Sequence, residues 1–168
     1  MKKNLLLVMA LIAATLTSFG NDKSRSEVSR SWSIDENFTA IAAKGNVEVV
    51  LVPGDSKTIG LAGDEKQVEA VHLKIENGVL MITGSKGCSA KYRTVIYVPV
   101  QQLQKVILKG GSDLSSRGRI AMAKLHIRIE GESKVNIKNI GDVVIESDDK
   151  HQFNYEKSER SIIRIEKA

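Results

Sequence analysis

Glu130 and Glu132 come closest to a catalytic pair in this sequence. Their spacing of two residues would place both on one face of a strand, near Lys109 and Arg128. Glycoside hydrolysis needs two carboxyl groups that face one sugar bond, and lyase chemistry needs a base beside a neutralised uronate. The same alternation is typical of any solvent-facing strand. A non-catalytic protein is therefore the main hypothesis, and a small carbohydrate-active enzyme is the alternative.

The outward positions of the predicted strands carry repeated basic side chains, and they form the best candidate binding face. The residues assigned to this face are Lys109, Arg128, Glu130, Glu132 and Lys134. A face with excess positive charge suits an anionic glycan, lipopolysaccharide or a protein partner. Simple solubility is the other interpretation. The sequence assigns no catalytic, cofactor-binding or metal-binding residue.

Four acidic residues near the end of the chain, Asp142, Glu146, Asp148 and Asp149, offer the oxygen ligands that Ca²⁺ prefers. The segment lacks the Gly-rich repeat of calcium β-rolls and the spacing of an EF-hand loop. These acids are therefore interpreted as a solvated turn.

The histidines and the cysteine suggest no site. His72, His126 and His151 are dispersed and lack the spacing of metal ligands. Cys88 is the only cysteine, so an internal disulfide is excluded. A loop position for Cys88 is favoured over a reactive thiol.

The first twenty residues predict a signal peptide. Lys2 and Lys3 precede an apolar stretch over residues 5–16, and Ser18 and Gly20 are small residues before a cleavage point. No second long apolar run follows, so no transmembrane segment is expected after cleavage. The predicted location is the periplasm, the cell surface or the medium of a Gram-negative bacterium. Mixed charges and 4% aromatic residues argue against nucleic-acid binding.

The rest of the chain predicts one all-β domain. Residues 21–33 are polar and are predicted to be a flexible lead, with Trp32 docking on the domain of residues 34–168. Short β-branched runs alternate with turn signals, and the strongest is Asn77-Gly78, which predicts a hairpin. A single short helix is expected at about 64–70, with Asp64 as its cap and Gln67 returning the bond.

A repeated unit, apolar–x–apolar–x–small, indicates the architecture. Its second apolar residue falls at positions 61, 82, 108, 129 and 145. Stacking such units in register would place Lys109 beside Glu130 and Asp113 beside Lys134. The prediction is a right-handed β-helix, or β-solenoid, with a hairpin-like part before about residue 100. A β-sandwich meander is the alternative.

These patterns resemble the head GIN domain family of autotransporter adhesin-like proteins from Bacteroidetes-type envelopes. The resemblance covers about 37–168 and rests on NFTAI (37–41), GNVEV (45–49), ENGVLMI (76–82), VIYVP (95–99), LQKV (103–106) and GGSDL (110–114). It implies a pectin-lyase-like β-helix without recognised catalytic residues, and a role in adhesion. The family's Gly-Ser-Gly turns are not intact here, which argues against a long stalk. An oligomer is left open.

The last segment, residues 153–168, is expected to end in a strand. Ile162, Ile163 and Ile165 are too apolar for a free tail. A purely structural envelope component without a soluble ligand is a third functional hypothesis.

Overall fold

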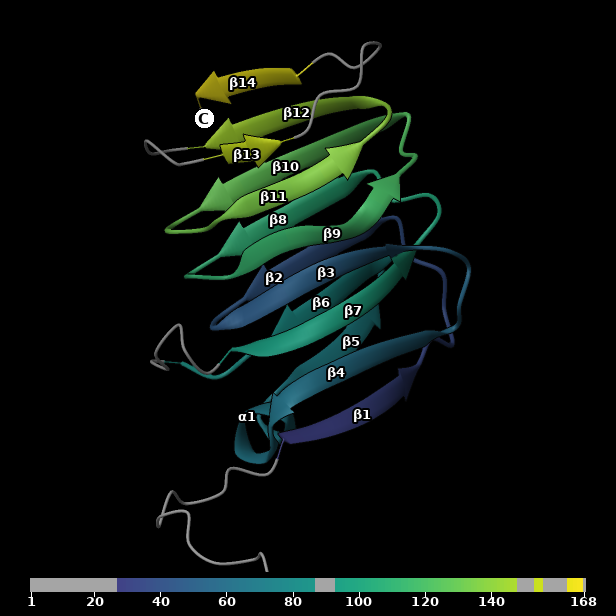
Figure 1. Ribbon diagram of the computed structural model, residues 1–168, viewed down its shortest axis with the longest axis vertical. Helices are drawn as coiled ribbons and strands as arrows, with labels where there is room; N and C mark the ends of the chain where they lie inside the picture. Colours follow the sequence, from purple (N-terminus) through teal and green to yellow (C-terminus); the bar gives the residue numbers. More distant parts are fainter. Residues whose placement is uncertain (1–26, 87–92, 148–152, 156–162, 168) are drawn as a thin grey trace, which may run out of the picture.

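The computed structural model describes residues 27–86, 93–147, 153–155 and 163–167. These residues form two mixed β-sheets, called sheet I and sheet II, which enclose one apolar core. Figure 1 shows the strands lying across the long axis, with β1 and β5 at one end and β13 and β14 at the other. A single short helix within this part of the chain, α1 (Glu65–Glu69), lies at the β1 end.

The strands do not follow one another in chain order within either sheet. Sheet I has the order β1 (Glu27–Ser33), β4 (Thr58–Asp64), β7 (Thr94–Val100), β3 (Val47–Pro53), β9 (Asp113–Ile120), β11 (Val135–Asn139) and β13 (Phe153–Tyr155). Sheet II has the order β14 (Ile163–Lys167), β12 (Asp142–Ser147), β10 (Lys124–Glu130), β8 (Lys105–Lys109), β2 (Ala40–Lys44), β6 (Val79–Thr83) and β5 (His72–Glu76).

The prediction of a right-handed β-helix is wrong. The described strands form two separate sheets and do not close into a coil, so the arrangement fits the β-sandwich alternative. Antiparallel pairs join β1 to β4, β4 to β7 and β5 to β6. In addition, β2 lies between β6 and β8, and β3 lies between β7 and β9. Successive coils of a β-helix would instead stack in chain order.

The repeated unit misled because it reports local alternation and says nothing about which strand is the neighbour. From β8 onward, β8, β10 and β12 do pair in parallel, and Lys109 lies beside Glu130 in the register. The neighbours of β8 and β9 on the other side are β2 and β3, which come from about sixty residues earlier in the chain. Long-range packing decides that choice, and no local pattern encodes it.

The predicted hairpin and helix are confirmed. Asn77 and Gly78 have φ angles of 52° and 73° and connect the antiparallel strands β5 and β6. Asp64 caps α1, and its Oδ1 accepts a hydrogen bond from the Lys66 backbone N–H at 3.2 Å. Gln67, expected to complete the cap, accepts a bond from the Ser85 hydroxyl at 2.5 Å.

The segment assigned to a lead, residues 21–33, contains β1 from residue 27 onward. This strand pairs antiparallel with β4, and Trp32 is half-buried against the core, where the sequence predicted that it docks. The polar sequence hid the strand because an edge strand can expose most of its side chains and still pair its backbone.

The core lies between the sheets because apolar residues alternate along the strands. In β7 and β10 every second side chain is buried, as strand geometry requires when only one face is covered. The fully buried side chains are Ile41, Leu51, Ile59, Leu80, Ile82, Ile96, Leu108, Leu114, Ile120, Leu125, Ile127 and Ile129.

Two further strands bear on the sequence analysis. The weakly alternating segment Asp113–Ile120 forms β9, which the sequence did not predict. A terminal strand is confirmed as β14, which pairs in parallel with β12, while Ile162 lies outside the described residues. None of the described residues belongs to a helix long and apolar enough to cross a bilayer.

Candidate functional site

The outer surface of sheet II carries the main candidate site, which we call the basic face. Its side chains occupy the outward positions of β5, β6, β2, β8 and β10, opposite the buried ones such as Val106 and Leu108. Its basic residues are Lys44, Lys74, Lys105, Lys109, Lys124 and Arg128, and its acidic residues are Glu76 and Glu130. The face therefore has a clear excess of positive charge.

Small and apolar side chains fill the centre of this face. In the register, Ala42 lies between Met81 of β6 and Ile107 of β8. Ala40 and Val79 form the next pair along the strands. Met81 is 42% exposed, while the other four are half-buried. A partner could thus bury apolar surface in the middle and meet cations at the rim.

Three of the five residues predicted for the binding face meet here. The Lys109 Nζ lies 2.7 Å from the Glu130 Oε2, and the Arg128 Nε lies 3.2 Å from the Glu130 Oε1. The second contact is an ion pair without hydrogen-bond geometry, since no acceptor is aligned with that N–H. The hydrogen bond from Lys109 lowers the pKa of Glu130, and the charges of Lys109 and Arg128 act in the same direction.

Two cations of the basic face keep their charge available to a ligand. Lys44 and Lys105 are exposed, and neither forms an ion pair within the part of the chain that the structure describes. They lie at opposite ends of the paired strands β2 and β8. An anion on this face would meet them without first breaking an internal pair.

The other two predicted residues do not belong to the basic face. Glu132 and Lys134 are exposed in the connection between β10 and β11, which joins the two sheets. The backbone N–H of Lys134 donates to the Asp113 Oδ1 at 2.8 Å, so these two residues are neighbours as predicted, through the main chain. Period-2 spacing failed here because β10 ends at Glu130 and the chain turns.

The remaining chemical candidates are not brought together. Asp142 and Glu146 lie on β12 four residues apart, about 13 Å along a strand. Within the described ranges no group of three or more His, Cys, Asp or Glu side chains could hold a metal ion. His72 and His126 lie on different strands, β5 and β10. Cys88, Asp148, Asp149 and His151 lie outside the described residues.

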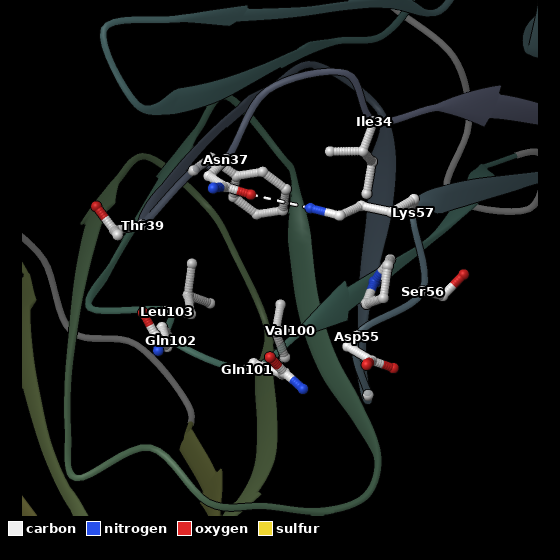
Figure 2. Close-up of a pocket in the computed structure, with 13 residues that line it drawn as sticks. Ile34, Asn37, Thr39, Asp55, Ser56, Lys57, Val100, Gln101, Gln102 and Leu103 are labelled. Atoms are coloured by element: carbon white, nitrogen blue, oxygen red, sulfur yellow. Dashed lines mark hydrogen bonds between the residues drawn. The ribbon is translucent and has the colours of Figure 1, made fainter.

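Two adjoining hollows lie at one end of the sandwich, and the sequence analysis did not foresee them. The first has a volume of about 350 Å³ and is formed by the segments 34–39, 54–57 and 99–103. Figure 2 shows Asn37 and Lys57 on one side and Gln101 and Gln102 on the other. The Lys57 Nζ donates to the Asn37 Oδ1 at 2.9 Å.

The second hollow has a volume of about 520 Å³ and shares Gln101, Gln102 and Leu103 with the first. Its other walls are Gln104 and the residues 121–124 and His126. The only local signal in the sequence is the glutamine-rich run Gln101–Gln104, since the other walls come from distant segments.

Comparison with known proteins agrees with this architecture. A crystal structure of a “putative adhesin” from Parabacteroides distasonis matches with a TM-score of 0.51 at 11% identity, covering 86% of this chain and 78% of that one. A second “putative adhesin”, from Parabacteroides merdae, gives 0.45 at 11% identity over 86% and 97% of the two chains. A “putative lipid binding protein” from P. distasonis gives 0.46 at 15% identity over 77% and 61%.

Among curated proteins, none matches the chain. The family profile described as “Putative auto-transporter adhesin, head GIN domain” matches residues 37–165, which is most of the chain. This range contains both sheets from β2 to β14, and with them the basic face and the two hollows. The chain therefore belongs to the head GIN domain family.

Proposed function

We propose that this protein is an exported, non-catalytic binding module of the cell envelope, and that it binds an anionic glycan or a protein surface of similar charge through the basic face. The observation that carries the proposal is the apolar centre around Ala42, Met81 and Ile107, bordered by basic side chains. Exposed apolar surface with a polar rim is characteristic of interaction sites. The adhesin description of the family supports the same class of function.

Charge and apolar contact contribute differently to such binding. The cations raise the rate of encounter with an anionic partner, and salt screens their effect. The apolar centre supplies contact that salt does not weaken. A specific partner of this face should therefore bind more weakly at high salt but should not be released completely.

The arrangement of Glu130 supports binding over catalysis. A general acid at neutral pH needs a raised pKa, whereas the ion pair with Lys109 lowers that of Glu130. Glu132 lies beyond the end of β10 and does not face the same surface. The two carboxylates therefore do not form the pair that glycoside hydrolysis requires.

Export is part of the proposal. Residues 1–20 are taken as a cleaved signal peptide, and residues 34–168 as the single domain that the periplasm or cell surface receives. Mass spectrometry of the N-terminus of the protein purified from cell envelopes tests this step. A mature chain that begins at Asn21 is expected, and a chain that retains residue 1 in the cytoplasm would contradict it.

The binding test compares the purified protein with a variant of the basic face. Lys44→Glu combined with Lys105→Glu reverses two unpaired charges and leaves the core unchanged. Lys138→Glu combined with Lys134→Glu is the matched control, because it makes the same charge change on exposed residues away from the basic face. The ligands are lipopolysaccharide, hexagalacturonate and a neutral hexasaccharide, each at low and high salt.

The expected result is binding of at least one anionic glycan that falls about tenfold in the Lys44/Lys105 variant and less than about threefold in the control. Equal loss in both variants would show that net charge alone is responsible. Absence of any anionic ligand would contradict the glycan proposal, and crosslinking in intact envelopes would then decide whether a protein partner occupies the face.

A further inference from the structure

The two hollows at the end of the sandwich form a site distinct from the basic face. We propose that they bind a short neutral oligosaccharide, which runs across the segment Gln101–Gln104 from one hollow into the other. Their volumes, about 350 and 520 Å³, fall in the range typical of small-molecule sites. Three residues line both hollows, Gln101, Gln102 and Leu103, so a ligand longer than one hollow would cross this segment.

The chemistry of the first hollow matches a sugar. Phe38 is half-buried in its wall and offers an apolar ring beside Ile34 and Leu103. The rim carries the side-chain amides of Gln101 and Gln102, which can each donate and accept hydrogen bonds. A sugar hydroxyl has the same double capacity, and the faces of its ring are apolar. An aromatic ring next to several amides therefore suits both parts of a saccharide.

The charges in the first hollow favour a neutral ligand. The hollow contains one acid and one base, Asp55 and Lys57, which offset each other. The Lys57 ammonium already donates to the Asn37 carbonyl oxygen. An anionic group placed here would meet the Asp55 carboxylate. This separates the site from the basic face, where unpaired cations dominate.

The backbone around the hollows is fixed, so little order has to be gained on binding. The Gln104 N–H donates to the Thr39 carbonyl at 2.8 Å, and the Gln104 carbonyl accepts from the His126 N–H at 2.9 Å. In the second hollow, the buried Asn139 side chain bonds both the N–H and the carbonyl of Met122, each at 2.9 Å.

Meanwhile the side chains of Gln101, Gln102 and Gln104 stay exposed. Exposed hydrogen-bonding groups on a fixed backbone are a preorganised arrangement, which lowers the cost of binding. The second hollow adds Lys124 at its wall, and this ammonium can donate to a hydroxyl as well as to an anion. Neutral and acidic chains must therefore both be tested.

The test uses the purified ¹⁵N-labelled protein and titrates maltohexaose, cellohexaose, chitohexaose and hexagalacturonate, followed by NMR. Gln101→Ala with Gln102→Ala removes two exposed amides from the shared segment. Phe38→Leu removes the ring and keeps an apolar side chain in the wall. Asn136→Ala, an exposed amide on β11, is the matched control.

The expected result is that a neutral hexasaccharide shifts the amide signals of residues 101–104. Its affinity should fall at least about tenfold in the glutamine double variant and in Phe38→Leu, and should not change in Asn136→Ala or in the Lys44/Lys105 variant. The proposal is overturned if no neutral chain shifts these signals, if only hexagalacturonate does, or if the folded glutamine variant binds as tightly as the original protein.

Discussion

The Nζ of Lys109 lies 2.7 Å from the Oε2 of Glu130, and the two residues are direct neighbours in the parallel register of β8 and β10. The pair joins adjacent strands on the outer surface of sheet II. Because Arg128 also contacts Glu130, one carboxylate is held between two cations. The acid is therefore a structural element of the basic face.

This arrangement predicts a pH-dependent stability. The pKa of Glu130 is lowered in the folded protein, chiefly by the hydrogen bond from Lys109. The folded state thus holds the ionised form more strongly than the unfolded state, where glutamate titrates at about 4.3. The contribution is fully present above that value and is lost as the pH falls through the lowered pKa. Glu130→Gln should be less stable than the original protein near neutral pH, and the difference should shrink below about pH 4. Urea unfolding at several pH values measures it, and a difference independent of pH would contradict the assignment.

Arg93 and Asp113 form a second polar connection, across sheet I. The Arg93 guanidinium pairs with the Asp113 carboxylate, and its Nε donates to the Asn46 Oδ1 at 3.0 Å. The Arg93 and Asp113 side chains are only 20% and 15% exposed. Asp113→Ala should therefore cost about 2 kcal/mol of unfolding free energy, since it leaves a largely buried cation without its carboxylate.

The matched comparison for that change is the exposed pair Lys74–Glu76, whose atoms are 3.1 Å apart. Glu76→Ala should change stability by less than about 0.5 kcal/mol, because exposed ion pairs contribute little. Similar effects in the two variants would show that burial of the Arg93–Asp113 pair does not matter. Chemical denaturation provides both values.

Neighbouring residues of β8 predict opposite sensitivities to truncation. Leu108 is completely buried between the sheets, whereas Ile107 is half-buried on the basic face. Leu108→Ala should destabilise the domain by about 3 kcal/mol through a core cavity, and Ile107→Ala by about 1 kcal/mol. A larger effect at Ile107 would mean that the assigned faces of β8 are reversed. Equilibrium unfolding of both variants distinguishes these outcomes.

Gly141 is required for a close approach of two loops. A Cβ at this position would collide with the carbonyl oxygen of Met122 and would lie 2.6 Å from that of Ala123. Both are backbone atoms that cannot move aside cheaply, so Gly141→Ala should cost about 3 kcal/mol. Gly118 is the control: its φ is +83° but nothing lies near its missing Cβ. Gly118→Ala should cost about 1–2 kcal/mol, from backbone strain alone. Thermal melts that rank the two variants in the reverse order would contradict this account.

The terminal strand β14 is expected to contribute to stability. It pairs in parallel with β12 along residues 143–147, beside the buried Val143 and Ile145. Removing residues 163–168 should cost about 2 kcal/mol, because it uncovers the edge of β12 and part of the apolar surface beneath it. Arg164→Ala, an exposed change on the same strand, should cost less than about 0.5 kcal/mol. An unchanged melting temperature after the truncation would show that β14 does not dock.

The sequence by itself determined much of the local structure, because alternation and turn chemistry act over a few residues. Strands such as β7 and β10 follow from their alternating apolar side chains, and the β5–β6 hairpin follows from Asn77-Gly78. The meeting of Lys109 and Glu130 was also predictable, since both stand at matched positions of similar segments. Glu132 and Lys134 were misplaced because the pattern did not show where β10 ends and the chain turns.

Only the tertiary structure decided how the strands combine. The choice of β2 and β3 as neighbours of β8 and β9 turns the expected β-helix into two mixed sheets, and it depends on which apolar faces pack best at long range. The same packing places Ala42, Met81 and Ile107 side by side on the basic face. It also brings Asn37, Lys57 and Gln101 around one hollow. These residues are far apart in the chain and share no sequence pattern, so their contacts arise only once the sheets have formed.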